Sequence, residues 1–136
     1  MGKILAFDYG GKRTGLAITD ELQIIASPLE GIDTNDIWDH IQRLMNSEKI
    51  SDFVVGDPSI FGDATDSSAM IDQFCKDLAK KYPAIPLHRV DESYSSRDAM
   101  QAMVAGGMRK KNRRNKKNLD MVSAAVILQR FLESRV

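Results

Sequence analysis

The sequence predicts an α/β domain built on a mixed five-stranded sheet with helices on both faces. The first three strand-like runs follow one another through connections too short to hold a helix, so neighbouring strands should be antiparallel. The two later runs are linked through helical patterns, which favours parallel pairing by right-handed crossovers. The 136 residues suffice for one hydrophobic core, so we expect residues 1–136 to form a single domain.

The N-terminal third contains the antiparallel strands. Apolar runs predict strands at residues 3–8, 15–19 and 23–27. The connections between them, a glycine-containing segment and a short polar one, are typical of turns. After Pro28 the apolar spacing becomes helical, at Ile37, Ile41, Leu44 and Met45, with N-cap candidates at residues 34–36.

The rest of the chain alternates strands and helices. We expect a strand at residues 53–56, a helix ending before Pro83, a strand at 87–90, a helix at 96–105 that stops at Gly106 and Gly107, and a closing helix from 119. The inward face of the helix before Pro83 should be Met70, Ile71, Phe74, Leu78 and Ala79. Cys75, the single cysteine, fits a buried thiol there, and Asn118 fits the N-cap of the closing helix.

Positive charge is concentrated in residues 109–117, which we call the basic segment. Its seven bases are Arg109, Lys110, Lys111, Arg113, Arg114, Lys116 and Lys117. The whole chain has 19 basic and 19 acidic side chains, so the remainder holds 12 bases against 19 acids, a net charge of −7. An acidic body with one basic segment suits a nucleic-acid partner. Lacking aromatic residues, the segment should bind phosphates rather than read bases, and should be solvated and mobile without substrate.

No part of the sequence resembles a membrane anchor. No run reaches the roughly 18 apolar residues that a spanning helix needs, and no signal-peptide pattern precedes the first strand. We therefore expect a soluble, cytoplasmic protein without a membrane partner.

Three acidic residues stand at the ends of separate elements: Asp8, Glu92 and Asp120. Asp8 follows a strand that is apolar on both faces, where an ionised carboxylate is costly unless something compensates it. Strand ends and helix starts converge in a mixed sheet, so the three acids should meet in one cluster. Carboxylate oxygens suit one or two Mg²⁺ or Mn²⁺ ions, which would support hydrolysis of phosphodiester bonds.

Each acid also has a structural alternative. Asp8 could accept hydrogen bonds from the backbone of the following turn, and Asp120 could serve only the dipole of its helix. Asp91 competes with Glu92, because successive strand residues face opposite sides. In the turn after Asp8, Lys12 and Arg13 are placed to meet phosphate oxygens, although exposed turns also carry charge for solubility.

Three segments of the chain resemble the motifs of the YqgF family of Holliday-junction-resolvase-like nucleases. They are Asp8-Tyr-Gly-Gly-Lys-Arg-Thr-Gly-Leu-Ala, Val90-Asp-Glu-Ser and Leu119-Asp-Met-Val-Ser-Ala-Ala-Val-Ile-Leu-Gln. The resemblance implies a ribonuclease H-like fold, with Asp8, Glu92 and Asp120 as metal-binding carboxylates. It also implies a bacterial cytoplasmic enzyme that processes the 5′ end of pre-16S rRNA. The chain departs from the family pattern at Ser93 and Asp57, and Asp57 could add an acid to the cluster.

The sequence is also compatible with other functions. A resolvase acting on branched DNA would need a dimer to cut symmetrically, so both a monomer and a homodimer are possible. A non-catalytic nucleic-acid-binding or ribosome-assembly protein could use the same basic segment. The opening strands also resemble those of actin-like and sugar-kinase ATPases, but such proteins clamp nucleotide between two domains, and this chain has room for one.

Overall fold

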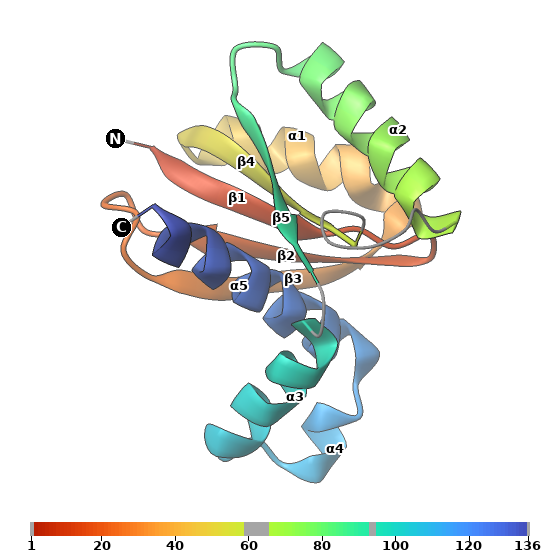
Figure 1. Cartoon of the computed structure of the whole chain (residues 1–136), viewed down its shortest axis with the longest axis vertical. Helices are drawn as coiled ribbons and strands as arrows, with labels where there is room; N and C mark the ends of the chain where they lie inside the picture. Colours follow the sequence, from red (N-terminus) through yellow and green to blue (C-terminus); the bar gives the residue numbers. More distant parts are fainter. Residues whose placement is uncertain (1, 59–65, 93–94, 136) are drawn as a thin grey trace.

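The computed structural model describes residues 2–58, 66–92 and 95–135 and contains a five-stranded mixed sheet (Figure 1). The strands are β1 (Lys3–Asp8), β2 (Arg13–Thr19), β3 (Ala26–Asp33), β4 (Ile50–Asp57) and β5 (Leu87–Asp91). Their order is β3-β2-β1-β4-β5, with antiparallel pairs among β1, β2 and β3 and parallel pairs among β1, β4 and β5. The predicted combination of pairings is confirmed.

Helices cover both faces of the sheet, also as predicted (Figure 1). They are α1 (Ile37–Ser47), which follows the short 3-10 turn Thr34–Asp36, then α2 (Asp66–Lys81), α3 (Ser95–Ala105), α4 (Lys110–Arg113) and α5 (Lys116–Ser134). Leu5 and Phe7 of β1 pack in the core under α1 and α2, whereas Ile4 and Ala6 pack in the core under α5. By this alternation, Asp8 follows Ala6 on the α5 face.

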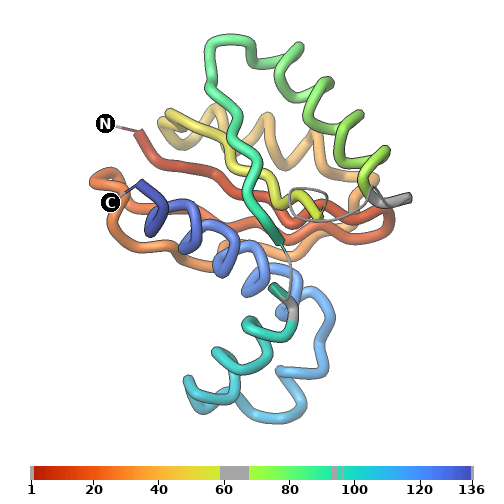
Figure 2. Tube along the Cα trace, viewed as in Figure 1, coloured from red at the N-terminus to blue at the C-terminus, as the bar shows by residue number. Residues whose placement is uncertain are grey.

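Two helices lie beyond the sheet. After β5 the chain forms α3 and α4 and then returns across the sheet as α5 (Figure 2). Ala99 and Met103 of α3 are buried. The predicted glycine break is confirmed: Gly107 has a φ of +79°, and the N–H of Met108 donates to the carbonyl oxygen of Met103, which closes the end of α3.

The third strand lies further along the chain than predicted. Residues 23–25 are not a strand, because Gln23 adopts a left-handed backbone with a φ of 57°. The Asp20 carboxylate accepts hydrogen bonds from the N–H groups of Leu22, Ile24 and Ile25 and so folds this stretch into a turn. Pro28 does not end the strand, since β3 is at the sheet edge and has one unpaired side.

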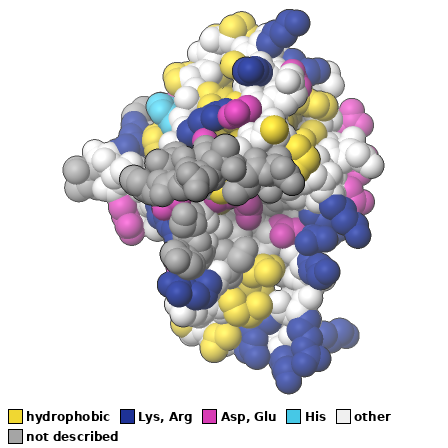
Figure 3. Space-filling model, turned by 45° about the vertical axis from the view of Figure 1, so that its right-hand side comes forward, with side chains coloured by type: hydrophobic (Ala, Val, Ile, Leu, Met, Phe, Trp, Pro, Cys, Tyr) yellow, Lys and Arg dark blue, Asp and Glu magenta, His cyan; other side chains and the backbone are white. Residues whose placement is uncertain are grey.

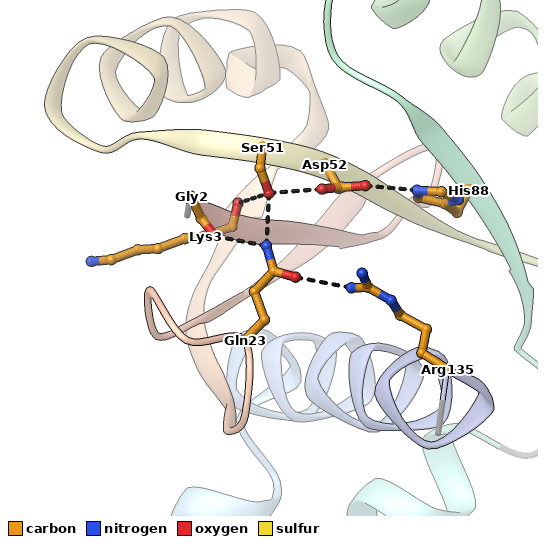
Figure 4. Close-up of polar contacts among 7 residues, drawn as sticks. All are labelled: Gly2, Lys3, Gln23, Ser51, Asp52, His88 and Arg135. Carbon is orange, nitrogen blue, oxygen red and sulfur yellow. Dashed lines mark hydrogen bonds and ion pairs between the residues drawn. The ribbon is translucent and has the colours of Figure 1, made fainter.

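The Gln23 side chain ties together the end of the sheet that is remote from Asp8 (Figure 4). Its Nε2 donates to the Gly2 carbonyl oxygen at 2.8 Å and to Ser51 Oγ at 2.9 Å, and its Oε1 accepts from Arg135 at 2.9 Å. Both chain ends are thereby joined to β4.

The predicted inward face of α2 is confirmed for three of its five residues. Ile71, Phe74 and Leu78 are buried, and so is Cys75. Met70 and Ala79 are exposed, and their assignment to the core was wrong. Met70 instead reaches over the β1–β2 turn, where its Sδ lies 3.3 Å from the position that a Cβ on Gly11 would take.

The last helix begins earlier than predicted. Its N-cap is Asn115 rather than Asn118, because the Asn115 side chain accepts a hydrogen bond from the Lys117 N–H at 3.0 Å. The basic segment is therefore helical in α4 and in the first turn of α5, where a mobile segment was expected. Within the described residues, no helix is long and apolar enough to cross a bilayer.

Candidate functional site

Asp8 lies in a cross-strand row with two glycines. The register pairs Asp8 with Gly15 of β2, and Gly15 with Gly31 of β3. A Cβ on Gly15 would lie 1.9 Å from the Asp120 carbonyl oxygen, and one on Gly31 would lie 2.3 Å from that of Lys117. Because neither residue has a side chain, the start of α5 rests directly on the sheet. This close approach brings Asp120 next to Asp8.

A third glycine makes room for Glu92. A Cβ on Gly56 of β4 would lie 2.9 Å from Glu92 Oε2. Glu92 follows β5, and its N–H donates to the Asp57 carbonyl oxygen at 3.4 Å. The side chain crosses Gly56, and its carboxyl shares a hydrogen bond with that of Asp8. Between the two acids that the sequence left open, the structure brings Glu92, not Asp91, into contact with Asp8.

Among the described residues, no positively charged group is found to lower the pKa of Asp8. The pKa of Asp8 is raised well above its usual value, first by burial and then by the negative charge of Glu92 and its hydrogen bond. Asp120 adds a smaller repulsion in the same direction. Burial also raises the pKa of Glu92, and the charges of Asp57 and Asp91 add to this increase. A cation bound here would remove this repulsion.

Asp120 is held by an arginine that was expected to face substrate. Arg13 Nε donates to Asp120 Oδ2 at 2.9 Å, and both side chains are partly buried. Asp120 is the fifth residue of α5, past the first turn, so the helix dipole does not explain its position. The ion pair with Arg13 and the contact over Gly15 do explain it.

The turn after Asp8 is fastened from the other face of the sheet. Thr34 Oγ1 donates to the Gly10 carbonyl oxygen at 2.6 Å, and the Thr34 N–H donates to the Lys12 carbonyl oxygen at 3.0 Å. Thr14 Oγ1 lies 2.9 Å from Thr34 Oγ1. These contacts hold the turn without the Asp8 side chain, which argues against a purely structural role for Asp8. Lys12 is exposed at the tip.

The donor set fits a divalent cation of the magnesium type. In the described ranges, no three acidic, histidine or cysteine side chains lie close enough together to enclose a metal ion. Asp120 forms its ion pair with Arg13 instead. Asp8 and Glu92 could bind directly, because Mg²⁺ is usually held by one or two carboxylates together with waters and substrate phosphate. One turn from Asp120, the buried Ser123 Oγ has no hydrogen-bond partner among the described atoms.

The structure describes one of the two departures from the family pattern, Asp57, but not the other, Ser93. Asp57 is 3% exposed and pairs with Arg89 Nη1 at 3.2 Å, and Arg89 also binds Asp72 of α2 at 2.6 Å. Asp57 thus has its own cationic partner on the α2 side and does not join the cluster directly. Ser93 lies outside the described residues.

The basic segment ends close to this cluster. Lys116 and Asp120 are four residues apart on α5 and share a helix face. Figure 3 shows Lys and Arg side chains gathered on the lower part of the molecule, where α4 and the start of α5 lie. Lys117 pairs with Asp33 at 3.7 Å, and Arg113 donates to the Met108 carbonyl oxygen. The other five bases, Arg109, Lys110, Lys111, Arg114 and Lys116, form no ion pair within the described part of the chain.

Comparisons with known proteins identify the family of this chain. The family model "RuvX: Holliday junction resolvase" matches residues 2–134. A protein of Amoebophilus asiaticus is 46% identical over 135 residues, covering 98% of this chain and 96% of its own. One of Christiangramia forsetii is 43% identical over 133 residues, covering 97% and 98%. Both relatives carry the name "Putative pre-16S rRNA nuclease".

A solved structure, described as "T. thermophilus RuvC in complex with Holliday junction substrate", superposes with a TM-score of 0.61 at 16% identity, covering 99% of this chain and 96% of that one. This likeness confirms the expected ribonuclease H-like fold. The strand order, the family match over nearly the whole chain and the relatives above 40% identity lead to one conclusion: this chain belongs to the RuvX family of nucleases.

Proposed function

We propose that this chain is a metal-dependent nuclease of the bacterial cytoplasm that processes the 5′ end of pre-16S rRNA, acting as one domain over residues 1–136. The observation that carries the proposal is the proximity of Asp8, Glu92 and Asp120, which come from three separate elements; burial and then the charges of the other two acids raise the pKa of Asp8. The names of the relatives support the choice of substrate.

The residues of the cluster have separate roles in this proposal. Asp8, Glu92 and Asp120 would hold one or two Mg²⁺ or Mn²⁺ ions, and such ions would supply an activated water and stabilisation of the leaving oxygen. Arg13 keeps the Asp120 carboxylate directed at the cluster. Lys12 and the basic segment bind flanking phosphates and align the strand across the end of the sheet.

The test is a cleavage assay with two matched substrates. One is an RNA that carries the leader and first nucleotides of 16S rRNA, and the other is a four-way DNA junction of equal strand length. With Mg²⁺ or Mn²⁺ we expect cleavage of the RNA at the 5′ end of the mature sequence, and none with EDTA. Absence of cleavage in every metal would contradict the proposal.

A resolvase acting on branched DNA is the second candidate, because the family description and the superposed complex both name Holliday junctions. Symmetric cutting of a junction requires two equivalent active sites, so this function needs a homodimer. Junction cleavage that exceeds RNA cleavage, together with a dimer in sedimentation, would favour it. Salt-sensitive binding without turnover would instead indicate a non-catalytic ribosome-assembly role.

Arg13→Gln is expected to slow cleavage about 10- to 100-fold, because residues that orient a metal-binding carboxylate typically contribute this much. The loss should shrink at high Mg²⁺, and the fold should change little, since the ion pair is partly exposed. Mg²⁺ titrations of the cleavage rate, with Arg13→Lys for comparison, measure the effect. A uniform loss of rate at all Mg²⁺ concentrations would argue against an orienting role.

Removing charge from the basic segment should weaken binding without affecting the chemical step. In the triple variant Lys110→Gln, Lys111→Gln and Arg114→Gln, the slope of log affinity against log salt for single-stranded RNA should fall by about 2. The rate at saturating substrate should stay near that of the parent. The matched control is Lys49→Gln, Lys76→Gln and Lys80→Gln, which are exposed bases elsewhere. Equal salt slopes for the two triple variants would contradict the prediction.

A further inference from the structure

A hollow of about 200 Å³ lies between α1, α2 and the residue that follows Asp8. Its lining is aromatic. Tyr9 stacks on Phe74 with ring centroids 4.5 Å apart and planes inclined by 15°, and the Trp38 ring lies 5.6 Å from that of Phe74. Tyr9 and Trp38 are only partly buried, so they offer aromatic surface to a ligand, although the Lys81 ammonium lies over the Trp38 ring at 4.6 Å from its centroid.

The polar groups of the hollow are the Asp77 carboxylate, the Gln73 amide and the Tyr9 hydroxyl. Asp77 and Gln73 stand one turn apart on α2, and Gln73 Nε2 donates to Asp77 Oδ1 at 3.0 Å. A carboxylate accepts through both oxygens and repels phosphate. The lining therefore suits an uncharged planar ring that donates hydrogen bonds along one edge. Among the bases of RNA, guanine presents two adjacent N–H donors, N1–H and the 2-amino group.

The hollow adjoins the carboxylate cluster. Asp8 faces α5, while the next residue, Tyr9, packs with the core on the α1 and α2 side. A strand whose phosphate reaches Asp8 and Glu92 can thus place a neighbouring base around the end of β1 in the hollow. Met70 lines the hollow and extends it to the turn at Gly11.

We propose that this hollow binds one unpaired guanine base next to the scissile phosphate. The base stacks against Tyr9 and Trp38 and donates from N1–H and its 2-amino group to the Asp77 carboxylate. The identification of the ligand as part of a nucleic-acid strand rests on the proposed nuclease function. Base recognition in the hollow would complement the phosphate binding expected of the basic segment.

Trp38 is the single tryptophan of the chain, so its fluorescence reports on the hollow directly. The full chain would be titrated in EDTA and high salt with guanosine, inosine, adenosine and uridine monophosphates. We expect a saturable change with guanosine monophosphate at about tenfold lower concentration than with the adenosine or uridine compounds. Inosine monophosphate, which lacks the 2-amino group, should bind several-fold more weakly than the guanosine compound.

The variant Asp77→Asn should lose about tenfold in guanosine monophosphate affinity and retain the weak binding of the other nucleotides. The control Glu21→Gln removes an exposed carboxylate at the remote end of the sheet and should change nothing. Circular dichroism checks that both variants fold. Equal binding of all four nucleotides, or an Asp77→Asn variant that binds like the parent, would overturn the proposal.

The binding assay contains no metal and requires no cleavage, so the two proposals can fail separately. Selective guanine binding by a protein that cleaves nothing would support the hollow and contradict the nuclease role. Cleavage that is indifferent to guanine near the cut, with no nucleotide-selective fluorescence change, would contradict the hollow alone.

Discussion

Asp8→Asn is expected to reduce RNA cleavage at least about a thousandfold, because the amide cannot supply the negative charge that a divalent cation requires at the centre of the cluster. Asp8 is the residue through which the other two acids are connected: Glu92 shares a hydrogen bond with it, and Asp120 acts on it through charge. Cleavage time courses in Mg²⁺ and Mn²⁺ measure the effect. The control is Glu21→Gln, which should cleave at the parental rate.

The same variant should be more stable than the parent when no metal is present. The native pKa values of Asp8 and Glu92 lie above their unfolded values, so the native state binds more protons. Stability of the metal-free parent should therefore fall as pH rises from about 4 through these native pKa values. At neutral pH, Asp8→Asn should melt about 3–6 °C higher than the parent in EDTA.

Mg²⁺ should raise the melting temperature of the parent and leave that of Asp8→Asn nearly unchanged. An Asp8→Asn protein that cleaves normally would contradict the assignment of the cluster. One that is inactive but melts below the parent in EDTA would contradict the account of repulsion between the carboxylates.

The elements that sequence predicted well are those with a strong local pattern. β1 is apolar on both faces and was predicted at its observed bounds, and the apolar residues of α1 at helical spacing, with N-cap candidates at residues 34–36, predicted where that helix begins. Predictions were wrong where side-chain hydrogen bonds decide the structure. Residues 23–25 form a turn because the Asp20 carboxylate accepts from the N–H groups of Leu22, Ile24 and Ile25. The Gln23 side chain then bonds to Gly2 and Ser51, which lie far away in sequence.

In the candidate site too, features with a local sequence pattern could be predicted, and features that depend on distant contacts could not. Its carboxylates could be proposed from their places at element ends, but the choice between Asp91 and Glu92 depends on the path of the chain across Gly56. The pairing of Arg13 with Asp120 spans 107 positions and leaves no local pattern. Glycines inside strands were the available sign of close backbone approach, and none of Gly15, Gly31 and Gly56 was recognised from it.

The glycine row provides the second large effect: Gly15→Ala should destabilise the fold by about 3 kcal/mol and abolish most cleavage. The new Cβ would lie 1.9 Å from the Asp120 carbonyl oxygen and 2.9 Å from the Met121 nitrogen. Both are backbone atoms, so no change of side-chain rotamer relieves the contact. The start of α5 must move away from β2, and Asp120 moves with it.

Urea unfolding measures the loss of stability, and cleavage at a temperature where circular dichroism shows the variant fully folded measures the loss of activity. Gly106→Ala is the matched control, because its Cβ would lie 3.3 Å from the nearest atom, the Ala102 carbonyl oxygen. It should stay within about 0.5 kcal/mol of the parent and cleave normally. Gly31→Ala should cost similar stability but less activity, since it displaces Lys117, one turn before Asp120. If folded Gly15→Ala cleaves like the parent, Asp120 does not need its position beside Asp8, and the cluster functions with two carboxylates.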